Sequence, residues 1–277
     1  MNSSTVNSRT GAPRGVRVPY LIHTLWPLGL GCFLLHRAWN HHPLLGGLLP
    51  GRGPVSVVFV ILTIWTGIAA VIVGLAYGGR TLDFPVERIL VDSSGRPRLL
   101  AWLASPFGLI AGFVIRLGRI VKPEPFADEV APGLLVGGVP LVGDRQRVAA
   151  LSVGAVVNMC VEFGDRLGLA GKGCAYLREP LLDGTAPFPE SLDRTVAWVM
   201  ARRDPSLVEE TSGRVLIHCA QGHGRSAAVA ACVLLATGEA QTVDEAIERM
   251  RASRPGIRLG RAQRAAVEMF HKRNGAS

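Results

Sequence analysis

Hydrophobic and polar positions follow two different patterns along the 277-residue chain. Up to residue 122 the hydrophobic residues form long uncharged runs; beyond it, short hydrophobic runs alternate with amphipathic stretches and Gly- or Pro-containing turns. Uncharged runs of about 20 residues can cross a bilayer, whereas short hydrophobic runs alternating with helical patterns are typical of a parallel sheet. The sequence therefore predicts a membrane region followed by an α/β domain.

Three hydrophobic segments make up the expected membrane region, residues 19–122, which follows a disordered basic tail over residues 1–18. Val55–Tyr77 is the strongest, because its 23 uncharged residues can cross the hydrocarbon as a helix, although a buried core helix is the alternative. Tyr20–Leu35 is shorter and contains His23 and Pro27, but we expect it to cross as well. Leu99–Ile115 can cross, re-enter or lie in the membrane interface, and we expect the interfacial arrangement.

Residues 123–277 predict one α/β domain with a central, mostly parallel sheet flanked by helices. We interpret Pro123–Pro132 as a linker before this domain. Hydrophobic runs predict the strands, and helical spacing and capping residues predict the helices. The expected strands are Gly133–Gly137, Ala155–Met159, Ala175–Arg178 and Arg214–His218, and the expected helices are Asp144–Leu151, Pro189–Arg203, Ser226–Ala236 and those that follow Thr242 and Gly260.

The chain carries a formal net charge of +9, and 48% of its residues are hydrophobic. Residues 1–122 contain 12 Lys and Arg but only three acidic residues, whereas residues 123–277 contain 18 of each sign. Positive charge confined to the hydrophobic part favours a membrane over a nucleic acid as partner. Arginines precede the first segment and follow the second. The positive-inside rule then predicts a multi-pass inner- or plasma-membrane protein whose α/β domain faces the cytoplasm.

One motif predicts nucleophilic chemistry. In His218–Ser226, HCAQGHGRS, a hydrophobic strand ends at the cysteine, a Gly-containing loop follows, and a helix begins near Arg225. A helix N-terminus and inward-facing loop amides favour the thiolate of Cys219 and can bind a phosphoryl group. Gly222 and Gly224 allow the loop to turn. The planar guanidinium of Arg225 can hold two phosphoryl oxygens at once.

Other roles for these residues stay open. Cys219 can be a buried structural thiol, and His218, Cys219 and His223 can bind a metal, although no second Cys or His cluster lies nearby in the sequence. We expect His218 to orient the loop and tune the thiol rather than act as a base. His223 either contacts the substrate or is merely exposed. The five cysteines are odd in number and include no CxxC pair, which favours free thiols in a reducing compartment.

Hydrolysis of a phosphomonoester also needs an acid to protonate the departing oxygen. Asp183 lies in a Gly- and Pro-containing loop, within Glu179–Pro189, that follows a predicted strand and can hinge over a site. It is the candidate general acid, although beside Gly184 it can also be an ordinary turn residue. Glu179 and Asp193 are the next candidates.

Residues 125–272 resemble the dual-specificity phosphatases of the cysteine-based protein-tyrosine phosphatase superfamily. The resemblance rests on HCAQGHGRSA in the motif above, PGLLVGG from Pro132, VVNMC from Val156, PLLDGTAP around Asp183, and an Arg-Pro pair followed by Gln263. It implies the cysteine-phosphatase α/β fold and a two-step mechanism without metal or other cofactor.

The resemblance also implies a role for each matched residue. Cys219 would attack phosphorus, and Asp183 would act first as acid and then as base. Arg225 would hold the phosphoryl oxygens, and Ser226 would stabilise the departing thiolate. Phosphate binding would fall to the loop Cys219, Ala220, Gln221, Gly222, His223, Gly224 and Arg225.

Together these features predict a membrane-anchored phosphatase of bacterial type. We expect phosphorylated proteins as substrates, with phospholipid head groups of the phosphatidylglycerophosphate or phosphoinositide type as the alternative. Phosphoinositide-directed relatives often carry Lys in the loop, where this chain has Ala220, Gln221 and His223. A catalytically silent phospho-binding module would lack the nucleophile, arginine or acid. A rhodanese-like sulfurtransferase would lack the Arg-Ser ending and the upstream aspartate.

Six arginines near the C-terminus form a basic run. This run can bring an acidic substrate or a lipid to the site, or it can form an ordinary solvated helix face. The residues are Arg249, Arg251, Arg254, Arg258, Arg261 and Arg264.

Overall fold

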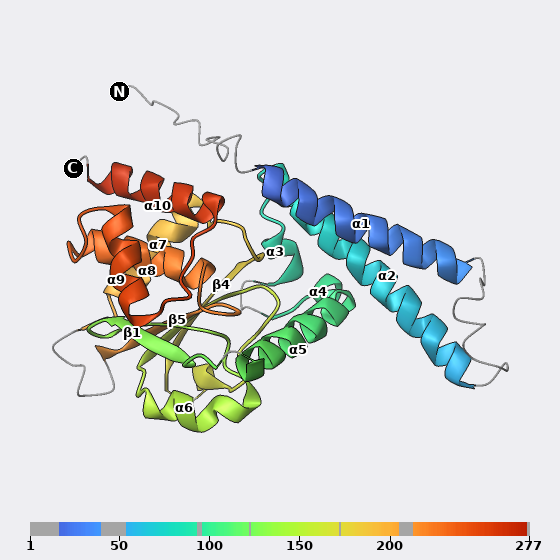
Figure 1. Cartoon of the computed structure of the whole chain (residues 1–277), viewed down its shortest axis with the longest axis horizontal. Coiled ribbons are helices and arrows are strands. Elements are labelled where there is room, and N and C mark those ends of the chain that lie inside the picture. The colour runs from blue at the N-terminus through green and yellow to red at the C-terminus, as the bar shows by residue number, and fades with distance from the viewer. Residues whose placement is uncertain are drawn as a thin grey trace.

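The structure, a computed structural model, describes residues 17–39, 54–92, 96–121, 123–171, 173–204 and 213–275. They form an α/β domain and a pair of long helices that extends away from it (Figure 1). The bounds of the N-terminal helices are α1 Arg17–Trp39, α2 Pro54–Thr81, α3 Glu87–Leu90, α4 Leu99–Leu103 and α5 Ser105–Val121. The helices α3, α4 and α5 lie between the long pair and the α/β domain (Figure 1).

The α/β domain follows from residue 123 onward. Its strands are β1 Ala127–Ala131, β2 Leu134–Gly137, β3 Ala155–Cys160, β4 Ala175–Leu181 and β5 Val215–His218. Its α-helices are α6 Arg145–Ala150, α7 Pro189–Met200, α8 Arg225–Ala236, α9 Val243–Ser253 and α10 Arg261–Asn274. Two short 3-10 helices, η2 Val142–Asp144 and η3 Leu169–Gly171, lie in the connections.

The strands form one sheet in the order β1-β2-β5-β3-β4. β1 pairs antiparallel with β2, and all the other neighbours are parallel. Because parallel strands end at the same edge of a sheet, the loops that follow β2, β3, β4 and β5 meet there. This carboxyl edge is where the functional residues gather.

Both faces of the sheet are covered, with α6 on one side and α7 to α10 on the other (Figure 1). Val215 and Ile217 of β5 belong to the large core formed with α7 to α10, and Leu216 belongs to a smaller core that includes Val148 of α6. A strand buried on both faces must be hydrophobic at successive positions, which explains the VLIH run of β5.

The α/β fold agrees with the prediction, and the predicted strands and helices of the domain are present with small shifts in their bounds. The interpretation of Pro123–Pro132 as a linker is wrong, because this stretch contains β1. The sequence of β1, ADEVA, has no clear hydrophobic alternation. It is an edge strand, so backbone pairing with β2 rather than side-chain burial defines it. Residues 1–16 of the expected basic tail lie outside the described residues, and Arg17 begins α1.

Close backbone contact joins α1 and α2. A Cβ atom on Gly31 of α1 would lie 2.8 Å from the carbonyl oxygen of Gly67 in α2, and one on Gly74 would lie 2.6 Å from Cγ of Leu28. Glycines at these crossing points let the two backbones approach, as is common where helices pack inside a membrane.

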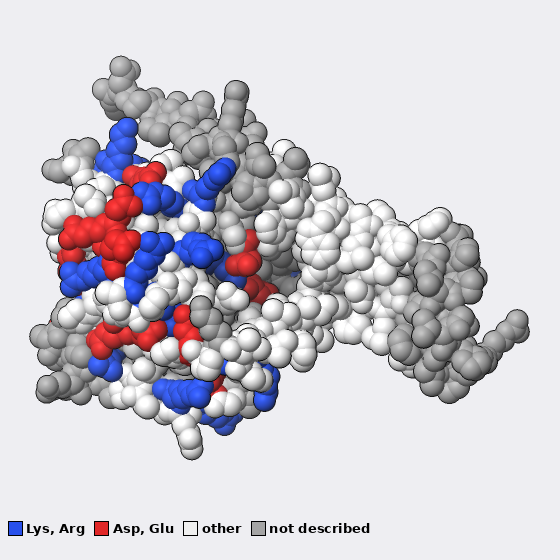
Figure 2. Space-filling model, in the orientation of Figure 1, with Lys and Arg blue, Asp and Glu red and all other residues white. Residues whose placement is uncertain are grey.

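Within the described residues, one helix is long and apolar enough to cross a membrane. This is the Val60–Thr81 part of α2, which has 22 residues and a mean hydropathy of 2.2. The apolar part of α1, Ile22–His36, is shorter. The third hydrophobic segment is divided at Ala104 into α4 and α5, and α5 exposes several large hydrophobic side chains. In contrast to the long helices, the α/β domain carries most of the charged side chains visible in this view (Figure 2).

Candidate active site

The His218–Ser226 motif lies at the carboxyl edge of the sheet. β5 ends at His218, and α8 begins at Arg225 after the intervening loop. The amide of Cys219 donates to the carbonyl of Gly137 at the end of the neighbouring strand β2, over 3.2 Å. The carbonyl of Ala220 accepts from the amide of Val139, over 3.1 Å. These two bonds anchor the start of the loop to the sheet.

The sulfur of Cys219 is buried among donors. It accepts hydrogen bonds from the amide of Gly222 at 3.2 Å and from the hydroxyl of Ser226 at 3.4 Å. Burial raises the pKa of the Cys219 thiol, but the charge of Arg225 and the hydrogen bonds from Ser226 and Gly222 outweigh burial, so the pKa is lowered from its ordinary value. The N-terminus of α8 adds partial positive charge. The arrangement therefore favours the thiolate, the reactive form of cysteine.

Hydrogen bonds from Arg254 set the direction of the Gly222 amide. The carbonyls of Gln221 and Gly222 accept from the buried guanidinium of Arg254, at 2.8 and 3.0 Å. Because a trans peptide points its C=O and N–H in opposite directions, the amide of Gly222 faces the sulfur of Cys219. Gly222 has φ +80, and a Cβ there would lie 2.4 Å from the carbonyl carbon of Gly137. Only glycine fits this position.

We expect Gly222→Ala to lower kcat/KM on an aryl phosphate by at least about tenfold, because a shift of about 1.4 kcal/mol in transition-state stabilisation suffices for that loss. Gly168→Ala is the matched control. Gly168 also has a positive φ, +64, but no atom within 4 Å of its Cβ position. Thermal unfolding then measures the strain that both variants share. Equal activity in the two variants would contradict a special role for the Gly222 backbone.

Arg225 is held by a carboxylate from the segment that follows β3. Its guanidinium is 1% exposed and binds Glu162 through Nη1–Oε2 at 2.9 Å and Nη2–Oε1 at 2.6 Å. Nη1 also donates to the carbonyl of Leu181, over 2.8 Å. Burial disfavours the charge, but Glu162 keeps the pKa of Arg225 above its ordinary value. Among the described residues, Nε of Arg225 has no hydrogen-bond acceptor, which leaves a donor for a ligand.

The loop that follows β4 brings Asp183 to the same place. Oδ1 of Asp183 lies 3.3 Å from Nη2 of Arg225, and the aspartate side chain is 78% exposed. Gly184 has φ +72 and makes the turn behind it. The structure thus brings Asp183 to Cys219, Arg225 and Ser226. The last three lie close together in the sequence, whereas Asp183 is 36 residues before Cys219.

The two other acid candidates are engaged elsewhere. Glu179 accepts from the hydroxyl of Ser191 and pairs with Arg194 at 3.0 Å. Asp193 pairs with Arg273 of α10 at 2.8 Å. Neither of these contacts involves the cysteine loop.

The two histidines of the motif differ in their surroundings. His218 is buried, and burial lowers its pKa to about 4, so it is neutral at pH 7. His223 has a partner that the sequence did not predict. Its Nε2 lies 2.8 Å from a carboxylate oxygen of Glu124, and both side chains are partly exposed. The His223 side chain therefore joins the loop to the segment before β1.

The basic run is not a continuous cationic surface. Arg254 is buried; besides the loop carbonyls it binds Asp128 at 2.6 Å and Glu124 at 3.2 Å. It therefore supports the loop from behind. Three other arginines of the run form ion pairs, namely Arg249–Glu239, Arg251–Glu248, Arg264–Asp244 and Arg264–Glu268.

Sequence reasoning missed three parts of the site. Glu162 follows β3 at the carboxyl edge of the sheet, and this position is the signal that could have identified it. Gln263, which had no assigned role, donates to the carbonyl of Thr185 in the Asp183 loop over 3.3 Å. Tyr77 and Arg80 of α2 contact the same loop, and no sequence signal connects them to it.

The remaining cysteines lack the surroundings of Cys219. Burial raises the pKa of Cys160 and of Cys232, which therefore stay protonated at neutral pH. All five cysteines are free. In the part of the chain that the structure describes, no group of three or more His, Cys, Asp or Glu side chains is placed to hold a metal ion.

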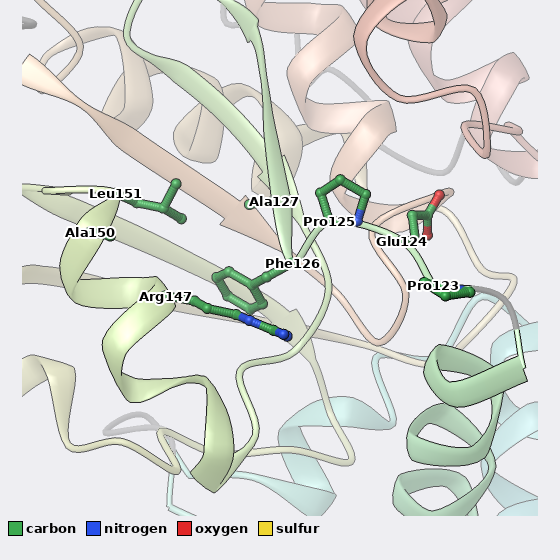
Figure 3. A pocket seen from close by; sticks show the side chains of 8 residues that line it. All are labelled: Pro123, Glu124, Pro125, Phe126, Ala127, Arg147, Ala150 and Leu151. Carbon is green, nitrogen blue, oxygen red and sulfur yellow. The ribbon is translucent and has the colours of Figure 1, made fainter.

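A surface hollow beside α6 is distinct from this site (Figure 3). In it the ring of Phe126 lies next to the side chain of Arg147. Its lining consists of Pro123, Glu124, Pro125, Phe126, Ala127, Arg147, Ala150 and Leu151. It contains neither the cysteine loop nor the Asp183 loop, so we do not assign it to catalysis.

The fold and the loop with its cysteine and arginine define a catalytic domain of the cysteine-dependent phosphatase class. The family model described as dual specificity phosphatase, catalytic domain, matches residues 146–272. Dual specificity phosphatase 28 of Mus musculus is 32% identical over 136 residues, which cover 48% of this chain and 76% of that protein. The chain belongs to the dual-specificity phosphatase family.

Two further similarities lie in the same range. Phosphatidylglycerophosphate phosphatase PTPMT2 of Arabidopsis thaliana is 31% identical over 148 residues, which cover 52% of this chain and 62% of that protein. The chain thus spans less than two thirds of this plant relative. The crystal structure of Tk-PTP in the active form is 27% identical, covers 54% of this chain and 98% of that chain, and superimposes with a TM-score of 0.46.

Proposed function

We propose that the protein is a membrane-anchored phosphomonoester hydrolase that acts through a phosphocysteine intermediate on the head group of a phospholipid. The observation that carries the proposed chemistry is the position of the Cys219 sulfur. It accepts from Gly222 and Ser226, in the loop that ends at the buried, charged Arg225. In this proposal α1 and α2 anchor the chain in the inner or plasma membrane. The arginines that flank them keep the α/β domain on the cytoplasmic side.

In the first step, the thiolate of Cys219 attacks phosphorus and the bond from phosphorus to the ester oxygen breaks. Asp183 gives its proton to the departing oxygen, which leaves as an alcohol. The free Nε donor of Arg225 and the loop amides hold the phosphoryl oxygens, whose charge is greatest in the transition state. Glu162 fixes the plane of the guanidinium, so that its donors point at the oxygens without reorientation.

In the second step, water attacks the phosphorus of the phosphocysteine. Asp183, now a carboxylate, takes a proton from this water. The bond between phosphorus and sulfur breaks, inorganic phosphate leaves, and the thiolate returns. The hydroxyl of Ser226, 3.4 Å from the sulfur, stabilises this leaving thiolate by its hydrogen bond.

The position of the site beside the hydrophobic helices supports a lipid substrate. Tyr77, near the end of the helix that is able to cross a membrane, donates to the carbonyl of Asp183 over 3.0 Å. The helix α5 contacts α2, and its side chains Leu109, Phe113 and Leu117 are exposed. A phosphate on a lipid head group can therefore reach the cysteine while the acyl chains stay in the bilayer. The plant relative PTPMT2 is named as a phosphatase of such a lipid.

A phosphorylated protein, the substrate expected from the sequence, is the second candidate. Asp183 is 78% exposed, which leaves the site open to a polypeptide. The name of a rat relative that is 31% identical over 135 residues, dual specificity protein phosphatase 12, also supports this alternative.

The test uses the full chain in lipid vesicles. Phosphate release is measured from phosphatidylglycerophosphate, from a phosphoinositide, and from phosphotyrosine and phosphothreonine peptides, each with Cys219→Ser as the blank. A lipidated phosphopeptide in the same vesicles is the matched control, because it shares the membrane and lacks the lipid head group. We expect at least about tenfold higher kcat/KM on a phospholipid than on the lipidated peptide, a difference of about 1.4 kcal/mol. A preference for the peptide would assign the enzyme to phosphoproteins.

A further inference from the structure

We propose that α1 and α2, besides anchoring the chain, position the loop that carries the general acid. The positioning residues are Tyr77 and Arg80 in the last turns of α2 and Tyr20 in the first turns of α1. This inference rests on the proposed phosphatase chemistry, in which Asp183 protonates the leaving group. It makes the hydrophobic helix pair a part of the catalytic apparatus.

Polar contacts from the two helices reach the backbone of the loop between Leu182 and Phe188. The hydroxyl of Tyr77 donates to the carbonyl of Asp183 over 3.0 Å. The guanidinium of Arg80 donates to the carbonyl of Ala186, and the hydroxyl of Tyr20 accepts from the amide of Ala186 over 3.1 Å. Both backbone polar groups of Ala186 are therefore held by side chains of the helix pair.

Apolar packing and a charged contact support the same attachment. Leu182, the neighbour of Asp183, is buried in a cluster with Ala76 and Tyr77 of α2 and Leu90 of α3. The guanidinium of Arg80 lies 4.0 Å from the centroid of the Phe188 ring, at the far end of the loop. Both ends of the loop thus contact α2.

Arg80 is itself held in place. It is 6% exposed, and its Nε lies 3.4 Å from a carboxylate oxygen of Glu87 in α3. Gly79 allows the close approach behind it, because a Cβ there would lie 2.4 Å from Cγ1 of Val86. The end of α2 is therefore a firm support for the loop.

The side chain of Asp183 depends on this support. It is 78% exposed and makes its ion pair with Arg225, which also has to bind the phosphoryl group. When substrate occupies that guanidinium, the loop backbone decides where the carboxyl group lies. From the α/β domain, Gln263 reaches the loop at Thr185, over 3.3 Å. The side-chain hydrogen bonds to the backbone of Asp183 and Ala186 come from the helix pair.

The test separates acid positioning from general damage by the choice of leaving group. In the full chain, in detergent micelles, kcat/KM is measured for phenyl phosphate, whose oxygen needs a proton to leave, and for difluoromethylumbelliferyl phosphate, whose phenolate leaves without one. Because kcat/KM reports only the first step, slow hydrolysis of the phosphocysteine does not mask the effect. We expect Tyr77→Phe to lower kcat/KM on phenyl phosphate by about two- to tenfold, the worth of one hydrogen bond, and to change the activated substrate by less than about twofold.

The chain offers a matched control. Besides Tyr20 and Tyr77 it has one other tyrosine, Tyr176, whose hydroxyl binds Asn158 at 2.9 Å. Tyr176→Phe removes a hydroxyl of the same kind and is expected to change neither substrate's kcat/KM. The double variant Tyr77→Phe, Arg80→Gln removes both hydrogen bonds from α2 to the loop backbone, and its loss on phenyl phosphate is expected to exceed about tenfold. Equal losses on the two substrates, or no loss beyond that of Tyr176→Phe, would overturn the inference.

Asp183→Asn distinguishes this inference from the proposed function. If Asp183 is the acid, this variant loses activity mainly on phenyl phosphate, by about 100-fold or more. A selective loss in Asp183→Asn without one in Tyr77→Phe rejects only the role of the helix pair. Absence of a selective loss in Asp183→Asn rejects the assignment of the acid itself, and the positioning role with it.

Discussion

Replacement of Cys219 by serine is expected to lower kcat by about 10⁴-fold or more on every phosphomonoester that the protein hydrolyses. The reason is that the loop amide, the Ser226 hydroxyl and Arg225 stabilise a thiolate, whose pKa lies below its ordinary value. A serine hydroxyl ionises far less readily, and the neighbouring His218 is only a weak base, because burial lowers its pKa to about 4. Phosphate release with the full chain measures the effect.

Cys232→Ala is the control for this change. Cys232 is a buried thiol in α8, the same helix that follows the loop, but burial raises its pKa. We expect this variant to keep its turnover even if its melting temperature falls. Turnover by Cys219→Ser at the rate of the unchanged protein would show that the nucleophile is another group.

Arg225→Lys is expected to lower kcat/KM by about 10²–10³-fold, although the positive charge is kept. Glu162 occupies Nη1 and Nη2 of the guanidinium in a two-bond contact, and Nε remains for the substrate. A lysine ammonium has no planar fork, so it cannot bind this carboxylate in the same way and still direct a donor at the phosphoryl oxygens. The loss should be similar on phenyl phosphate and on difluoromethylumbelliferyl phosphate, whereas the loss in Tyr77→Phe is expected mainly on phenyl phosphate.

Arg264→Lys is the matched substitution. Arg264 lies on α10 in partly exposed ion pairs with Asp244 and Glu268, where such pairs contribute about 0–1 kcal/mol. We expect kcat/KM to be unchanged. If Arg225→Lys were as active as Arg264→Lys, charge alone would suffice at the site, and the role of the planar fork would have to be abandoned.

Cys219→Ser and Arg225→Lys test the cysteine loop, whereas the comparison of leaving groups tests the Asp183 loop. The cysteine loop is built within the α/β domain, between β5 and α8. The Asp183 loop is bound on one side by Gln263 of the domain and on the other by Tyr77 and Arg80 of α2. A phosphatase lacking α1 and α2 would therefore keep its thiolate and lose part of the support for its acid.

Sequence reasoning could determine the features that depend on local interactions. The His218–Ser226 motif combines a hydrophobic strand, a turn with glycines and a helix start, and each of these is encoded by neighbouring residues. The same holds for the long uncharged run that became α2, and for Thr242, whose side chain accepts from the amide of Glu245 at the start of α9. Residue type and spacing suffice where the physical cause acts over one or two turns of chain.

Other features were predicted wrongly or not at all, because they depend on contacts between residues that are far apart in the sequence. The edge strand β1 depends on pairing with β2. Arg254, expected in a basic run, is buried because it binds the loop carbonyls and Asp128 in the interior. Glu162 lies 63 residues from Arg225, and Tyr77 lies 106 residues from Asp183. The sequence by itself specified the candidate nucleophile and its loop. Only the tertiary structure, which brings α2 and the segment after β3 to the carboxyl edge of the sheet, decided what holds the arginine and the candidate acid, because such contacts form only when separate elements meet.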